Sequence, residues 1–112
     1  LMPSADVASR TPPPILDVLV ALIGHARLSE ALPTVRAALA TGNRFVVATA
    51  LATTGKLQDN GAIPQLIALT GDANPTIRKL AFAALSDVGG ASFDTTEQWR
   101  AWATRVGVPG IE

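Results

Sequence analysis

The chain has no cysteine and no tyrosine, and it carries a single histidine. Without cysteine it cannot form a disulfide, a thiolate zinc site or a cysteine nucleophile, although this absence does not report a cellular compartment. Aromatic residues make up only 4% of the sequence, which leaves few stacking platforms for a small-molecule site. The usual materials of catalysis and metal binding are therefore scarce, and the sequence predicts no enzyme activity, no cofactor and no metal.

Net charge is also absent, because nine Lys and Arg residues balance nine Asp and Glu residues. Non-specific affinity for nucleic acid depends on an excess of cationic surface, so we do not expect DNA or RNA as a partner. No apolar run reaches the ~18 residues that a membrane helix needs. The longest candidate, residues 15–23, contains Asp17, and membrane insertion is not expected.

The 112 residues are enough for one domain, and 48% apolar residues can supply its core. We expect a flexible, proline-rich leader over residues 1–14, a folded domain over 15–106 and a short tail over 107–112. The leader ends in three prolines, at positions 12–14, and proline is well tolerated in the first turn of a helix.

Short helical patterns separated by Gly, Asn and Asp fill the predicted domain. The clearest begins at an Asn74 cap, continues with an apolar stripe to Val88 and stops at Gly89-Gly90. Similar patterns cover residues 15–23, 32–42, 43–55, 63–71 and 95–106, with Asn43 as a cap and Gly24 and Gly55 as expected stops. About six helices and no convincing strand predict an all-α fold.

Two stretches of the chain repeat at nearly the same offset. Ala31-Leu32-Pro33 returns as Ala62-Ile63-Pro64, and Ala50-Leu51 returns as Ala84-Leu85. The first offset is 31 and the second is 34. Each unit of this period holds two helices that are too short to be stable alone. Such repeats predict antiparallel helix pairs stacked into an α-solenoid.

Residues 62–67, 74–78 and 84–89 resemble a HEAT repeat of the short bacterial type that also occurs in phycobilin lyase subunits. The resemblance implies a right-handed solenoid whose second helices line the inner surface. It also implies that Asp72 and Arg78 belong to a ladder between neighbouring repeats. Residues 60–64 resemble an armadillo repeat opening as well, but the period is too short for three helices.

A non-enzymatic scaffold that binds another protein is the function this pattern favours, with the surface of the second helices as the leading site. Phe45 and Phe82 lie beside the apolar stripes of those helices, and we interpret them as packing between repeats. In the alternative interpretation, Phe45, Lys79 and Phe82 form part of an amphipathic docking strip. Two other roles stay open: an accessory subunit of an enzyme, such as a chromophore lyase, and a structural segment of a longer solenoid.

The last helix carries Trp99, Trp102 and Val106 at spacing i, i+3 and i+7. We interpret the two indoles as a lid over the final repeat, with Trp99 as an interface anchor in the alternative interpretation. Asp94 and Glu97 stand three residues apart just before this helix, where they are more typical of a helix cap than of an acid/base pair.

The first helix is apolar on two faces, one of which carries Ile15, Val18 and Leu22. The terminal helix of a solenoid needs a polar outer face, so a second molecule is expected to cover this one. The sequence therefore predicts contact with another protein or self-association through Ile15, Val18 and Leu22.

Overall fold

The computed structural model describes residues 12–110. These residues form six α-helices and two short 3-10 helices, η1 and η2, and contain no strand, so the all-α prediction is confirmed. Most of the predicted leader lies outside the described residues, and its last two residues, Pro13 and Pro14, are the first turn of a helix. The elements in chain order are α2 Pro13–Ala26, η1 Ser29–Ala31, α3 Leu32–Leu39, α4 Arg44–Leu57, η2 Asn60–Ala62, α5 Ile63–Leu69, α6 Pro75–Gly89 and α7 Thr96–Val106.

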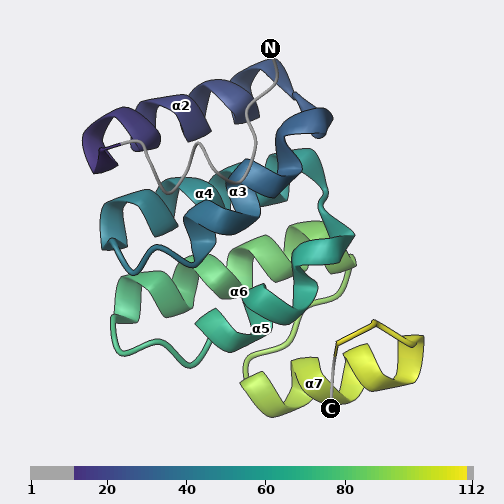
Figure 1. The fold of residues 1–112 in the computed structure, drawn as a ribbon. Helices are drawn as coiled ribbons and strands as arrows, with labels where there is room; N and C mark the ends of the chain where they lie inside the picture. The colour runs from purple at the N-terminus through teal and green to yellow at the C-terminus, as the bar shows by residue number, and fades with distance from the viewer. Residues whose placement is uncertain (1–11, 111–112) are drawn as a thin grey trace.

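The helices form two layers (Figure 1). Helices α2, α4 and α6 stack side by side in one layer, and the shorter α3 and α5 pack against α4 and α6 from the other. Helix α7 lies at the C-terminal end beside α5. This arrangement of helix pairs is a short α-solenoid, and its core, which includes the fully buried Val35, Leu51, Leu66 and Leu85, lies between the layers.

Local sequence signals set the helix starts. The Asn43 side chain accepts hydrogen bonds from the N–H groups of Phe45 and Val46, and the Asn74 side chain accepts one from Thr76. These bonds satisfy amides that a helix leaves unpaired at its first turn. Both predicted asparagine caps are therefore confirmed, as is the stop after Gly89, where Gly90 takes the left-handed conformation with φ of 70°.

The predicted stops at Gly24 and Gly55 are wrong. Helix α2 continues to Ala26 and α4 to Leu57, and each is followed by a residue with positive φ, 54° at Arg27 and 55° at Gln58. The two glycines are buried inside their helices, where each faces the next helix of the layer. They allow two helices to approach each other closely. In the sequence, a glycine with this role cannot be told from a glycine that ends a helix.

The predicted cap of α7 is displaced by one residue. Thr95 Oγ1 accepts from the Gln98 N–H at 3.1 Å, and Gln98 Oε1 accepts from the Thr95 N–H at 3.1 Å. This is a capping box made by Thr95 and Gln98 instead of Asp94 and Glu97. The two pairs overlap in the sequence with the same spacing, and the extended backbone of Thr95 selects the later one.

The contacts of Asp72 and Arg78 also differ from the ladder between repeats that the family resemblance implies. Arg78 Nη1 donates to the backbone oxygens of Asp72 at 2.8 Å and Ala73 at 3.1 Å, while the Asp72 carboxylate accepts from the Asn74 N–H. Arg78 therefore fastens the turn within its own repeat. The ion pair that links one repeat to the next is made by Arg36 and Asp59, 2.6 Å apart.

Over residues 12–110, none of the helices combines the length and the apolar character that a bilayer crossing requires.

Candidate functional site

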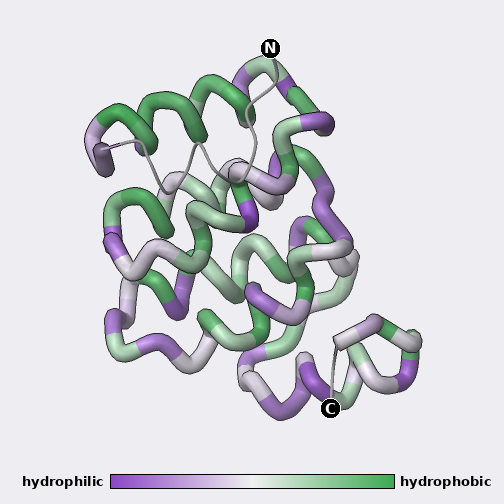
Figure 2. Tube along the Cα trace, in the orientation of Figure 1, coloured by the Kyte–Doolittle hydropathy of each residue, from purple (hydrophilic) through white to green (hydrophobic). Residues whose placement is uncertain are grey.

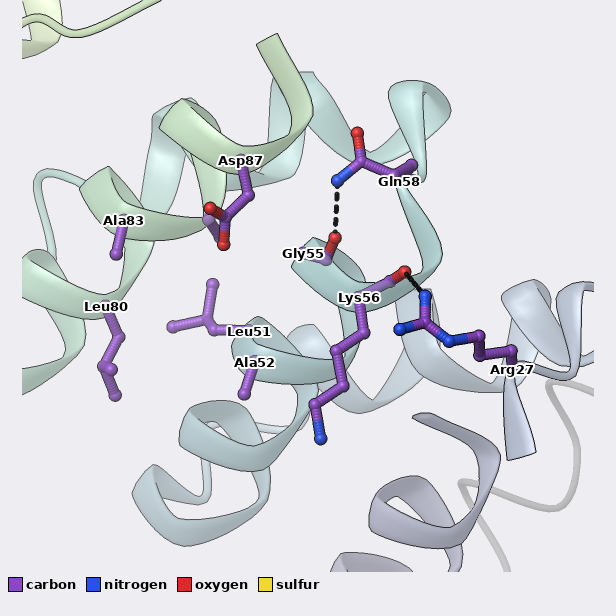
Figure 3. Close-up of a pocket in the computed structure, with 10 residues that line it drawn as sticks. Arg27, Leu51, Ala52, Gly55, Lys56, Gln58, Leu80, Ala83 and Asp87 are labelled. Atoms are coloured by element: carbon purple, nitrogen blue, oxygen red, sulfur yellow. Dashed lines mark hydrogen bonds between the residues drawn. The ribbon is translucent and has the colours of Figure 1, made fainter. Parts of the chain in front are cut away.

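A groove of about 530 Å³ runs between α4 and α6, with the C-terminal end of α2 at one side (Figure 3). Apolar side chains of α4 and α6 form its floor, and polar groups near the helix ends form its rim. The floor consists of Leu51, Ala52, Leu80, Ala83 and Ala84, and the rim consists of Arg27, Gly55, Lys56, Gln58 and Asp87.

Small residues keep the groove open. Gly55 lies directly beneath Asp87, and a Cβ added to Gly55 would stand only 2.9 Å from the Asp87 carboxylate. Ala52 and Ala83 are exposed and contribute only a methyl group each. Leu80 of the floor is half-buried and also packs against the core.

Two hydrogen bonds hold the rim in place. Arg27 Nη1 donates to the Lys56 backbone oxygen at 3.3 Å, and Gln58 Nε2 donates to the Gly55 backbone oxygen at 2.8 Å (Figure 3). The first bond satisfies a carbonyl group in the last turn of α4. The second adds to the bond that the Gln58 N–H already donates to the Gly55 oxygen. Because Arg27 comes from the end of α2, the first of these bonds links α2 to α4.

The charged side chains of the rim are exposed, and the cations outnumber the carboxylates. Arg27 and Lys56 supply two cations on the side of α2, and Asp87 supplies one carboxylate on α6. Such a groove can accept apolar side chains on its floor and orient a chain segment by its charges. In the described part of the chain, no three His, Cys, Asp or Glu side chains lie close enough together to hold a metal ion.

The family model for HEAT repeats matches residues 6–92. The chain belongs to the HEAT-repeat family. HEAT repeats are generally protein-interaction scaffolds and are generally not enzymes. No significant match was found among curated proteins or among solved structures.

The docking strip expected on this HEAT solenoid does not coincide with the groove. None of its three predicted members, Phe45, Lys79 and Phe82, lines the groove. Phe82 is half-buried against the core, which agrees with packing between repeats. Phe45 is 64% exposed beneath the guanidinium of Arg44, and Lys79 is exposed on α6.

Trp99 offers no surface to a partner, because its side chain is fully buried. Its ring meets Phe93 edge to face at 5.0 Å and Trp102 at 5.2 Å, and both indoles lie against Gly89 at the end of α6. Covering the last repeat accounts for this position, so Trp99 does not enter the site proposed below.

Ile15, Val18 and Leu22 form a second candidate surface, which we call the α2 stripe. They are 60%, 59% and 58% exposed, although all three are large and apolar. Figure 2 shows that α2 is hydrophobic along nearly its whole length, unlike the other helices. The α2 stripe is thus the main exposed apolar feature on the first helix of the HEAT domain.

Sequence reasoning did not select the rim residues Arg27, Lys56 and Asp87 as a binding site. The signal that could have found them is a third repeat of the same period. Gly24 and Gly55 are separated by the shorter of the two repeat offsets, and Gly55 and Gly89 by the longer, so the repeat relates the C-terminal parts of α2, α4 and α6. On that alignment α2 is the second helix of a repeat, and its end falls at the groove.

Proposed function

We propose that this HEAT-repeat chain is a non-enzymatic scaffold that binds a segment of another protein in the groove between α4 and α6. The observation that carries the proposal is the groove itself, an apolar floor with a charged rim on the layer of second helices. Membership of a family of interaction scaffolds supports the same function. The stacked helices supply a rigid surface, because each repeat is held by its neighbours.

The chemistry of the groove indicates what kind of segment fits. Alanine and leucine side chains on the floor favour small or medium apolar groups at the centre of the bound segment. Arg27 and Lys56 favour an acidic group at the α2 side, and Asp87 favours a basic group on the α6 side. Exposed rim charges of this kind act more on orientation and association rate than on affinity.

Purification of the chain with its native partners from the source cell, followed by mass spectrometry, identifies what it binds. A recovered enzyme would favour the role of accessory subunit, and a continuation of the same chain would favour a segment of a longer solenoid. Recovery of a different protein that is not an enzyme would support the scaffold proposal.

The recovered partner then tests the groove through the two lysines of the chain. Lys56 lines the groove, and Lys79 is exposed on α6 outside it. We expect Lys56→Glu to weaken binding by about tenfold, mainly through slower association at low salt, while Lys79→Glu changes it less than about twofold. Equal effects of the two substitutions would exclude the groove as the binding site.

A further inference from the structure

The two junctions in the layer of α2, α4 and α6 are fastened differently. Between α2 and α4, two hydroxyl groups of α4 bond to α2. Thr49 donates to the Asp17 carboxylate, and Thr53 donates to the Val20 backbone oxygen at 3.2 Å. Thr53 also packs against Gly24, where an added Cβ would lie 3.0 Å from the Thr53 hydroxyl. This junction therefore combines close packing with two side-chain hydrogen bonds.

The equivalent positions between α4 and α6 keep the packing but cannot make the bonds. At the longer repeat offset, Ala83 takes the place of Thr49 and Asp87 takes the place of Thr53. The Asp87 carboxylate faces Gly55 as the Thr53 hydroxyl faces the glycine of α2, 2.9 Å from the position of an added Cβ. Ala83 has no polar side-chain group, and an ionised carboxylate accepts hydrogen bonds without donating any. Neither α6 residue can thus donate the bond that its α4 counterpart makes.

Asp87 is also unfavourable where it stands in α6. It lies in the last turn of this helix, which ends at Gly89. The C-terminal end of a helix carries the negative end of the helix dipole, so a carboxylate there is destabilising. In the part of the chain that the structure describes, the one ion pair joins Arg36 to Asp59, and Asp87 has no ion-pair partner. Figure 3 shows that Lys56, the lysine of the groove, directs its side chain away from Asp87.

We propose that Asp87 determines which segments the groove accepts, by binding an arginine or lysine side chain of the partner. This inference rests on the proposed function, because it needs a segment bound between α4 and α6. The basic group supplies the donor that this junction lacks, and its charge offsets the negative end of the α6 dipole. Residues that break a local rule of the fold are expected mainly at functional sites, which is how we interpret Asp87.

The neighbours of Asp87 indicate what accompanies the basic side chain. Ala83 lies one turn earlier on the same face of α6 and is exposed on the groove floor. A segment that reaches Asp87 therefore places an apolar group on Ala83 beside its basic group. Because the segment covers this ion pair, loss of the pair should mainly speed dissociation, whereas the exposed Lys56 acts mainly on association.

Asp87→Thr separates binding from stability. It restores the hydroxyl that α4 has at the equivalent position and removes a charge from the last turn of α6, so the melting temperature should equal or exceed that of the wild type. The purified partner recovered by co-purification should bind this variant at least about tenfold more weakly, mainly through faster dissociation in surface plasmon resonance. Asp94→Thr is the matched control. Asp94 is exposed outside the groove, so this variant should bind within about twofold of the wild type.

An exchange of charges tests direct contact. Asp87→Arg should weaken binding of the same partner at least about tenfold. Changing the arginine and lysine residues of the bound segment to glutamate, one at a time, should restore the binding of Asp87→Arg at one position. Restoration at no position would overturn the proposal, because a direct ion pair must be coupled in this way.

The groove and this role of Asp87 are distinguished by comparison with Ala83→Trp, which fills the groove. If Ala83→Trp weakens binding and Asp87→Thr binds like the wild type, the groove is the site and the role of Asp87 is overturned. If neither variant weakens binding, the groove is excluded and the proposal for Asp87 is overturned with it. A loss of binding in Asp87→Thr together with a lower melting temperature would assign Asp87 a structural role and would also overturn the proposal.

Discussion

Arg36 of α3 donates two parallel hydrogen bonds to the Asp59 carboxylate, Nε to Oδ2 at 2.7 Å and Nη2 to Oδ1 at 2.6 Å. The Asp59 side chain is only 2% exposed, whereas that of Arg36 is 40% exposed. Asp59 precedes η2, the turn that opens the next repeat, and its carboxylate also accepts the Gly61 N–H at 3.1 Å. The pair therefore links successive repeats through a buried carboxylate that is costly to leave unpaired.

Gly61 should be intolerant of even a methyl group. A Cβ there would stand 2.4 Å from Nη2 of Arg36, so alanine must push the guanidinium off Asp59. We expect Gly61→Ala to lower the free energy of unfolding by roughly 1 to 3 kcal/mol, the cost of disturbing a buried charged bond. Gly71→Ala is the control, because its Cβ would meet only a backbone oxygen at 3.6 Å. Denaturant titration compares the two variants, and equal stabilities would contradict this role of Gly61.

The contribution of Arg36 to the free energy of unfolding should not depend on pH between neutral pH and about pH 10. The hydrogen bond with Asp59 raises the pKa of Arg36 above its ordinary value, against a smaller opposing effect of burial. A raised folded-state pKa stabilises the fold fully below the ordinary value, and this stability is lost only as pH rises through the folded value. The difference in unfolding free energy between wild type and Arg36→Ala should thus stay constant from neutral pH to about pH 10. A difference that falls across this range would contradict the assignment.

The start of α7 offers a test of the corrected cap. Thr95→Ala removes the side-chain oxygen that accepts the Gln98 N–H and should cost about 0.5 to 2 kcal/mol. Asp94→Ala removes a side chain for which the structure gives no capping bond, and it should cost much less. Thermal melts of the two variants decide between the caps, and the reverse order of stability would restore Asp94 as the cap.

The asparagine caps and the repeat period could be predicted because both depend on short stretches of sequence. Asn43 and Asn74 act on amides two or three residues away, and the helices they begin are where the pattern predicts them. Gly24 and Gly55 were misassigned because a glycine near a helix end has two uses. Which use applies depends on a side chain of the neighbouring helix in the layer, Thr53 for Gly24 and Asp87 for Gly55. Both side chains are remote from their glycine in the sequence.

The groove could not be predicted for a related reason. Its rim comes from three segments, at Arg27, at residues 55–58 and at Asp87, and only the stacking of α2, α4 and α6 brings them together. The resemblance to HEAT repeats pointed to the layer of second helices, on which the groove lies. It did not indicate which side of each helix lines the groove. Leu80 and Ala83 line it, whereas Lys79 and Phe82 do not.

Trp99 should be the most costly residue of the C-terminal helix to truncate. It is fully buried between Phe93, Trp102 and Gly89, so Trp99→Ala should cost about 3 to 5 kcal/mol. Trp99→Phe should cost less, because the indole Nε1 is buried without a hydrogen-bond partner in the described structure. Denaturant titration measures both losses. Short-wavelength tryptophan emission that disappears in Trp99→Phe would confirm the buried position, and unchanged emission would contradict it.

The most direct test of the scaffold account is the affinity of the co-purified partner for two variants that differ only in which layer they alter. Ala83 is an exposed alanine in the groove, and Ala68 is an exposed alanine on α5 in the opposite layer. Calorimetric titration should show that Ala83→Trp, which fills the groove, weakens binding by at least about tenfold, or ~1.4 kcal/mol. Ala68→Trp should bind within about twofold of the wild type. Unchanged binding by Ala83→Trp, or an equal loss in both variants, would contradict the groove as the protein-binding site.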